Sequence, residues 1–168
     1  LDMGENIRWV ARNFESLEPG TLKWIDSFDE NDTFLDIGAS SGWYSLYAAH
    51  KKIKVISVEP DSSNYALLNF NIIKNNFNDL ITSYCLAIHN KSNFSFLNKP
   101  NIGWLNALNS FDNNLDFEGK LFNPVFKQGV FGISLDEFLN KIKYCPSHIK
   151  IDVDGNESLV IKGAKKTL

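Results

Sequence analysis

The chain has 168 residues, of which 43% are hydrophobic and 22% are charged, and its formal net charge at pH 7 is -3. This balance predicts one globular domain, and the weakly acidic charge argues against a nucleic-acid partner, which needs a broad basic surface. Only two cysteines occur, Cys85 and Cys145, and the N-terminal segment has neither a signal-type apolar core nor a membrane-spanning run. We therefore predict a cytoplasmic protein with no membrane partner.

Strand and helix signals alternate along the chain, which predicts an α/β fold with a mostly parallel sheet. Residues 5–28 are predicted to be helical, with a break at Pro19 and Gly20. The predicted strands are 33–37, 54–58, 80–88 and 148–153. The other predicted helices are 41–51, a helix capped by Asp61 or Ser62, 134–139 and 157–167. We divide the single domain, 1–168, into a helical lead-in (1–30), a cofactor-binding half (33–88), a variable acceptor or lid region (89–133) and a final strand and helix (134–168).

A glycine-rich turn follows the first predicted strand and begins at Gly38. Glycines at such a place let the backbone approach a ligand closely, and the helix N-terminus presents unpaired amides. Dinucleotide enzymes use G-x-G-x-x-G here, but Ser40 and Trp43 stand where its second and third glycines belong. The pattern from Asp36 to Gly42, D-x-G-x-x-x-G, instead suits the methionyl part of S-adenosylmethionine. The alternative is a tight turn that binds nothing.

Glu59 ends the second predicted strand, 21 residues after Gly38. At that spacing its carboxylate is predicted to lie beside the glycine turn and to accept hydrogen bonds from both hydroxyls of a ribose. It would also repel a 2′-phosphate, which argues against NADP. The alternative is an ordinary surface acid.

Acidic residues gather at the end of the last predicted strand, where Lys150, Asp152 and Asp154 alternate onto one side. They could orient an acceptor hydroxyl, take its proton or hold a divalent cation. Asp152 is our candidate base and Glu157 its orienter, although Asp154 and Glu157 could instead only cap the last helix. His89 is a reserve base whose alternative is a solvated loop histidine.

The region 89–128 lacks a regular pattern, apart from a strand-like alternation at Phe94 and Phe96. Its aromatic and amide side chains could form a sugar-binding lid, or the phenylalanines could simply pack in the core. The candidates for a lid are Phe94, Phe96, Trp104, Asn106 and Phe111.

Five segments together resemble the FkbM family of S-adenosylmethionine-dependent methyltransferases, which have a class I (Rossmann-like) fold. They are EPGTLKWID, FLDIGASSGWYSLYAA, VISVEPDSSNYALLNFNIIKNN, the strand leading to CLAIHN, and HIKIDVDGNESLVIKGA. The resemblance implies a role in cofactor binding for a set of residues at the strand ends. Asp36, Gly38, Ala39 and Gly42 would line the methionine end, Glu59 would hold the ribose with Pro60 and Asp61 beside it, and Ala87 would lie near the adenine. Ser40, within the same turn, is a further candidate for cofactor binding.

The chain departs from the family pattern at a few positions. Ser40 stands where Asn is usual, and Asp154 and Asn156 replace residues of D-V-E-G-A-E. Class I methyltransferases have seven strands, but only four core strands can be placed here. We therefore expect a C-terminally truncated chain, or a homo-oligomer or partner chain that completes the sheet at its exposed edge.

These features predict an S-adenosylmethionine-dependent methyltransferase that modifies a hydroxyl of a sugar, glycan or small natural product. No metal ligands are assigned. Two alternatives remain: a nicotinamide-dependent reductase, which the residues at 40 and 43 disfavour, and a non-catalytic or incomplete cofactor-binding module that needs a further segment or partner chain.

Overall fold

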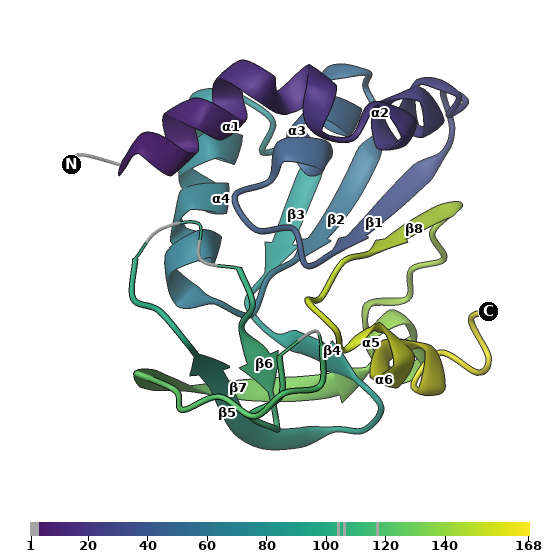
Figure 1. The fold of residues 1–168 in the computed structure, drawn as a ribbon. Helices are drawn as coiled ribbons and strands as arrows, with labels where there is room; N and C mark the ends of the chain where they lie inside the picture. The colour runs from purple at the N-terminus through teal and green to yellow at the C-terminus, as the bar shows by residue number, and fades with distance from the viewer. Residues whose placement is uncertain (1–3, 104, 106, 117) are drawn as a thin grey trace.

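The computed structural model describes residues 4–103, 105, 107–116 and 118–168, and its strands form two sheets (Figure 1). Sheet A is parallel, in the order β3-β2-β1-β8, and consists of β1 (Thr33–Ile37), β2 (Lys54–Val58), β3 (Ile81–Tyr84) and β8 (His148–Ile151). Sheet B is mixed, in the order β4-β7-β5-β6, and consists of β4 (Ala87–His89), β5 (Asn93–Lys99), β6 (Ser110–Phe111) and β7 (Phe126–Ser134). The order of sheet A matches half of a doubly wound Rossmann-like sheet, so the predicted class I α/β fold is confirmed.

Helices cover both faces of sheet A. They are α1 (Gly4–Leu17), α2 (Pro19–Asp26), α3 (Trp43–His50), α4 (Ser62–Lys74), α5 (Leu135–Ile142) and α6 (Glu157–Lys162). Because side chains alternate along a strand, Phe34 packs with α2, α3 and α4, whereas Leu35 and Ile37 pack with α5 and α6. None of the helices in the described ranges combines the length and hydropathy needed to cross a membrane.

Polar side chains begin two of the helices as the sequence predicts. The Asp61 carboxylate accepts the Ser63 amide at 2.8 Å at the start of α4. The Ser134 hydroxyl accepts the Glu137 amide at 3.3 Å at the start of α5. The Glu137 carboxylate, however, bonds to the Ser92 hydroxyl, so it ties α5 to sheet B.

The prediction of one strand over 80–88 was wrong, because that segment supplies a strand to each sheet. The Tyr84 carbonyl accepts the Glu59 amide at 3.1 Å, and after this bond the chain leaves sheet A. Ala87 then begins β4, which pairs in parallel with β7. The last helix is also shorter than predicted. It ends at Gly163, where a Cβ would lie 2.2 Å from the His89 carbonyl oxygen, so the helix end and β4 are in close contact.

Sheet B is fastened to the carboxyl end of β2 by buried polar contacts. The Lys99 ammonium lies 2.6 Å from the Asp61 carboxylate, and their side chains are 4% and 0% exposed. The Gln128 side chain donates to the Pro60 carbonyl at 2.7 Å and accepts the Ser62 amide at 3.0 Å. These contacts hold the inner face of sheet B, which carries Leu97 and Lys99, against the edge of sheet A.

The Lys99–Asp61 pair predicts a large difference between two lysine substitutions. Lys99→Met leaves the Asp61 carboxylate buried with only neutral donors such as Asn109, and should lower the free energy of unfolding by about 3–5 kcal/mol. The control is Lys91→Met, which breaks the exposed pair with Asp112 and should cost less than about 1 kcal/mol. Urea unfolding of both variants measures the difference, and equal losses would contradict the assignment.

Candidate functional site

The glycine turn is held where the ends of three strands meet. A Cβ on Gly38, which has φ +81°, would lie 1.8 Å from the Asp152 carbonyl oxygen, so the backbone at the end of β8 requires glycine here. The amides of Gly38 and Ala39 both donate to the Val58 carbonyl, at 2.9 and 3.0 Å. Gly42 has φ +92° and starts α3. The turn is therefore a fixed backbone surface.

Asp36 supports this turn from beneath. Its carboxylate accepts the Ser45 hydroxyl at 2.6 Å, and Ser45 in turn accepts the Ser57 hydroxyl at 2.8 Å. Burial raises the pKa of Asp36, and the nearby Lys150 opposes that shift. Its second oxygen is buried without a hydrogen-bond partner in the structure.

Glu59 joins the glycine turn to the start of α4. Its two carboxylate oxygens accept the backbone amides of Ser40 and Asp61, each at 2.8 Å, and the residue is 5% exposed. Burial raises the pKa of Glu59 to about 7; its two amide donors lower that pKa, and the charges of Asp61 and Asp154 raise it further. Since each carboxylate oxygen can accept two hydrogen bonds, one position on each is left for a ligand.

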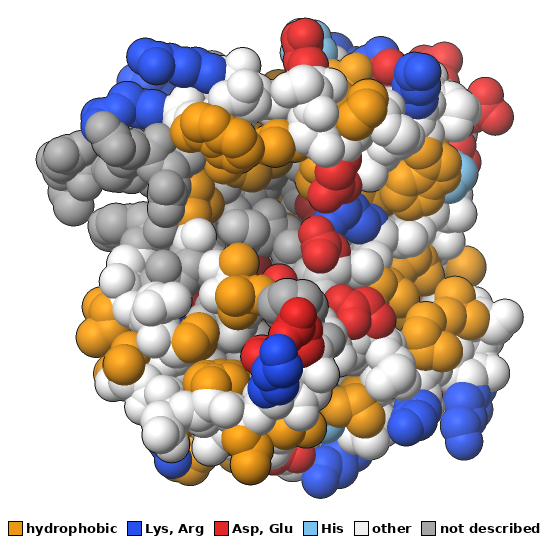
Figure 2. All heavy atoms as spheres, viewed as in Figure 1, with side chains coloured by type: hydrophobic (Ala, Val, Ile, Leu, Met, Phe, Trp, Pro, Cys, Tyr) orange, Lys and Arg blue, Asp and Glu red, His pale blue; other side chains and the backbone are white. Residues whose placement is uncertain are grey.

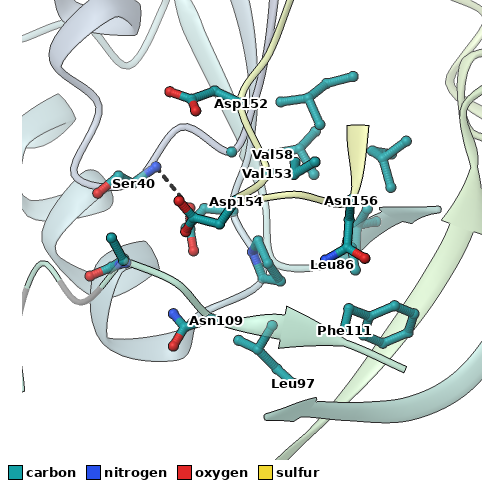
Figure 3. A pocket seen from close by; sticks show the side chains of 18 of the residues that line it. Ser40, Val58, Leu86, Leu97, Asn109, Phe111, Asp152, Val153, Asp154 and Asn156 are labelled. Atoms are coloured by element: carbon teal, nitrogen blue, oxygen red, sulfur yellow. Dashed lines mark hydrogen bonds between the residues drawn. The ribbon is translucent and has the colours of Figure 1, made fainter. Parts of the chain in front are cut away.

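A cavity of about 180 Å³ lies between this edge of sheet A and the inner face of sheet B. In Figure 3, Ser40 and Asp154 lie on one side of it, and Leu86, Leu97 and Phe111 lie on the other. Of the predicted cofactor residues, those that line the cavity are Gly38, Ser40, Glu59, Pro60 and Ala87. Those behind its wall are Asp36, Ala39, Gly42 and Asp61.

The structure separates the acids that the strand alternation groups together. The Asp152 side chain is 54% exposed and lies 2.7 Å from the Lys150 ammonium at the cavity edge. Asp154 follows the strand with φ +51°, lines the cavity and accepts the Leu108 amide at 2.6 Å. Burial raises the pKa of Asp154, and the charges of Asp152 and Glu157 add to the shift. Acidic side chains are visible near the middle of the face shown in Figure 2.

Glu157 holds the turn before α6. Its carboxylate accepts the backbone amides of Val153 and Gly155, at 3.1 and 3.2 Å, and it does not line the cavity. Glu157 therefore fastens the turn rather than capping the helix, because the start of α6 at Asn156 has no side-chain cap.

His89 is a buried side chain rather than a solvated loop residue. It is 3% exposed, lines the cavity and lies edge to face against Phe111, with 5.2 Å between ring centroids. Both of its ring nitrogens are buried without a hydrogen-bond partner in the structure. Burial lowers the pKa of His89; Asp112 raises it and Lys91 lowers it further.

The predicted lid residues differ in where the structure places them relative to the cavity. Phe94 and Phe96 are 85% and 54% exposed and alternate with Leu97, so they lie on the outer face of sheet B. Phe111 does line the cavity, and Trp104 and Asn106 lie outside the described residues.

Backbone amides of the lid segment donate hydrogen bonds to α4 and to the turn after β8. The Leu105 amide donates to Asn64 in α4 at 3.0 Å, and the Leu108 amide donates to Asp154. The sequence did not reveal the contacts of Lys99 and Asn109 with Asp61, or that of Asp154 with Leu108, because no motif marks a contact made between distant segments.

Comparison with known proteins assigns the family. The sequence profile of the methyltransferase FkbM domain matches residues 36–168, most of the chain. The chain belongs to the FkbM methyltransferase family. The match includes the glycine turn, Glu59 and the acids after β8, as the resemblance implied.

Solved methyltransferase structures match part of this chain. TYW2 from Pyrococcus horikoshii, solved with MeSAdo, is 25% identical, with 42% of this chain and 29% of that one covered and a TM-score of 0.38. Geranyl diphosphate methyltransferase in complex with SAM is 19% identical, with 48% and 33% covered and a TM-score of 0.41. Precorrin-6y C5,15-methyltransferase from Geobacter metallireducens is 18% identical, with 40% and 36% covered and a TM-score of 0.36. The matched part is thus about a third of each solved chain, and no curated protein is significantly similar.

The residues of this FkbM cavity fit S-adenosylmethionine. Gly38 and Ser40 line the cavity where the glycine turn follows β1, and a backbone surface of this kind suits a methionyl group. Glu59 keeps acceptor positions that ribose hydroxyls can use, and Ala87 lies in an apolar wall that suits a base. The carboxylates of Glu59 and Asp154 would repel a pyrophosphate.

The raised pKa of Glu59 predicts how the stability of the free protein depends on pH. The folded state keeps the Glu59 proton between its ordinary pKa of 4.5 and about 7, whereas the unfolded state loses it. Stability should therefore fall as pH rises through that window, by up to about 3 kcal/mol from this group. Urea unfolding at pH 5 to 8 measures the slope.

Glu59→Gln should flatten that slope, even though it also loses one amide hydrogen bond. The exposed Glu30→Gln is the matched control and should keep the wild-type slope. An unchanged slope in Glu59→Gln would show that the proton is held elsewhere.

Proposed function

We propose that the chain binds S-adenosylmethionine in this cavity and that its methyl group is transferred to a hydroxyl of a sugar, glycan or small natural product. The observation that carries the proposal is Glu59, a buried carboxylate fixed beside a glycine turn within an FkbM domain. S-adenosylmethionine supplies an electrophilic methyl group on a sulfonium. The protein then has to bind the donor, exclude water and align an acceptor oxygen.

The donor side of the proposal uses rigid groups. The carboxylate of Glu59 would accept hydrogen bonds from the ribose hydroxyls, and its two amide donors keep it in position. The backbone from Gly38 to Ser40 would contact the methionyl group, with Asp36 supporting the turn. Pro60 and Ala87 would contact the base.

The acceptor side of the proposal uses Asp152 as general base. Its carboxylate is exposed at the cavity edge, and its own carbonyl touches Gly38, so it lies next to the methionyl position. Lys150, which lies 4.9 Å above the ring of Tyr44, fixes the carboxylate by an ion pair. Such a base contributes about 10²- to 10⁴-fold to the rate. Glu157 would act as a positioning residue, because it holds the turn after Asp152.

Calorimetric titration tests the donor assignment. S-adenosylmethionine should bind and NADH should not, and Glu59→Ala should abolish binding of the former. Glu30→Ala is the exposed control and should bind normally. If wild type binds neither compound, the chain is instead a module that needs a further segment or partner chain.

Two aspartate substitutions test the base. Asp152→Asn should keep the affinity for S-adenosylmethionine and lower turnover by about 10²- to 10⁴-fold, because the acceptor proton loses its base. Asp79→Asn, on the exposed connection before β3, should change neither quantity. Turnover is measured as S-adenosylhomocysteine formed with a panel of monosaccharides as acceptors. Unchanged turnover in Asp152→Asn would remove this residue as the base.

A further inference from the structure

His89 is a buried polar side chain whose hydrogen bonds are not made within the protein. Its ring nitrogens have no partner, and the residue is 3% exposed. A buried polar group without a partner destabilises the folded state, so most such groups in native proteins are paired. Since His89 is among the residues that line the cavity, a bound ligand is the partner that would satisfy it.

The fold fixes His89 in place. It alternates with Ile88 along β4, so it shares the inner face of sheet B with Ala87. Phe111 lies against it, and the Phe111 ring occupies the space over Gly132, where a Cβ would lie 2.5 Å from the ring. The imidazole is therefore held as a rigid group at the cavity wall.

The surroundings of His89 indicate which part of a ligand it meets. Across the cavity from the Ser40 side, the apolar side chains of Leu86, Leu97 and Phe111 form much of the wall, with Asn156 beside them (Figure 3). The base and the methionyl chain of S-adenosylmethionine leave the ribose from different carbons. If Glu59 holds the ribose and the glycine turn holds the methionyl chain, the base lies in this apolar part, which suits its flat faces.

We propose that His89 is a specificity-determining residue that hydrogen-bonds the polar edge of the adenine base. The inference rests on the proposed function, because it takes the ribose position from Glu59. A neutral imidazole carries one donor and one acceptor, and adenine offers ring nitrogens that accept and an amino group that donates. Hypoxanthine replaces that amino group with a carbonyl and protonates N1, so it presents a different pattern.

The ionisation of His89 agrees with this role. Burial lowers its pKa, and the opposing charges of Asp112 and Lys91 act on it from the neighbouring strand connections. The ring is thus neutral at physiological pH and keeps both a donor and an acceptor.

The experiment titrates S-adenosylhomocysteine into wild type, His89→Leu and His89→Gln by calorimetry. His89→Leu should weaken binding by about 5- to 100-fold, because the base loses its hydrogen bond. His89→Gln, which still offers a donor and an acceptor, should bind within about fivefold of wild type. In the absence of ligand, His89→Leu should melt at or above the wild-type temperature, since it removes an unpaired buried group; a residue that only supports the fold would give a lower melting temperature.

A second ligand separates this inference from the proposed function. Wild type should prefer S-adenosylhomocysteine to S-inosylhomocysteine, and His89→Leu should bind both equally. An unchanged preference in His89→Leu would overturn the role of His89 while leaving the cofactor assignment intact. If wild type binds neither compound, the proposed function itself fails, and this inference fails with it.

Discussion

The site depends on the two hydrogen bonds that the Glu59 carboxylate accepts. One comes from the glycine turn at Ser40 and the other from Asp61 at the start of α4, so a single side chain fixes two segments that approach any ligand. Because the carboxylate is buried, these bonds cannot be exchanged for water at low cost. The same group therefore shapes the cavity and offers the hydrogen-bond acceptors inside it.

Sheet B supplies the second wall of the cavity at the edge of the Rossmann-like sheet. Its inner face places Phe111 and His89 opposite the glycine turn, and the Lys99–Asp61 pair holds it there. Asp61 thus has three tasks: it caps α4, donates its amide to Glu59 and binds Lys99. A substitution in sheet B that disturbs Lys99 can therefore affect the position of Glu59 through Asp61.

The turn after β8 places three acidic side chains in different surroundings. Asp152 stays at the exposed edge with Lys150, Asp154 turns into the cavity, and Glu157 holds the turn between them and α6. Strand alternation breaks down where the strand ends at Ile151, because Asp154 adopts a left-handed backbone conformation. Their different surroundings are the basis for assigning Asp152, and not its neighbours, as the proposed base.

Local patterns in the sequence were enough to predict the class of fold and the family, because alternation and the motif around Gly38 are read within short segments. The sequence did not reveal that 80–88 divides between two sheets, since strand signals carry no information about pairing partners. Nor did it reveal the Lys99–Asp61 pair or the burial of His89, which arise between residues far apart in the chain. Tertiary structure alone decided these features, because desolvation and pairing depend on what the completed fold places around a side chain.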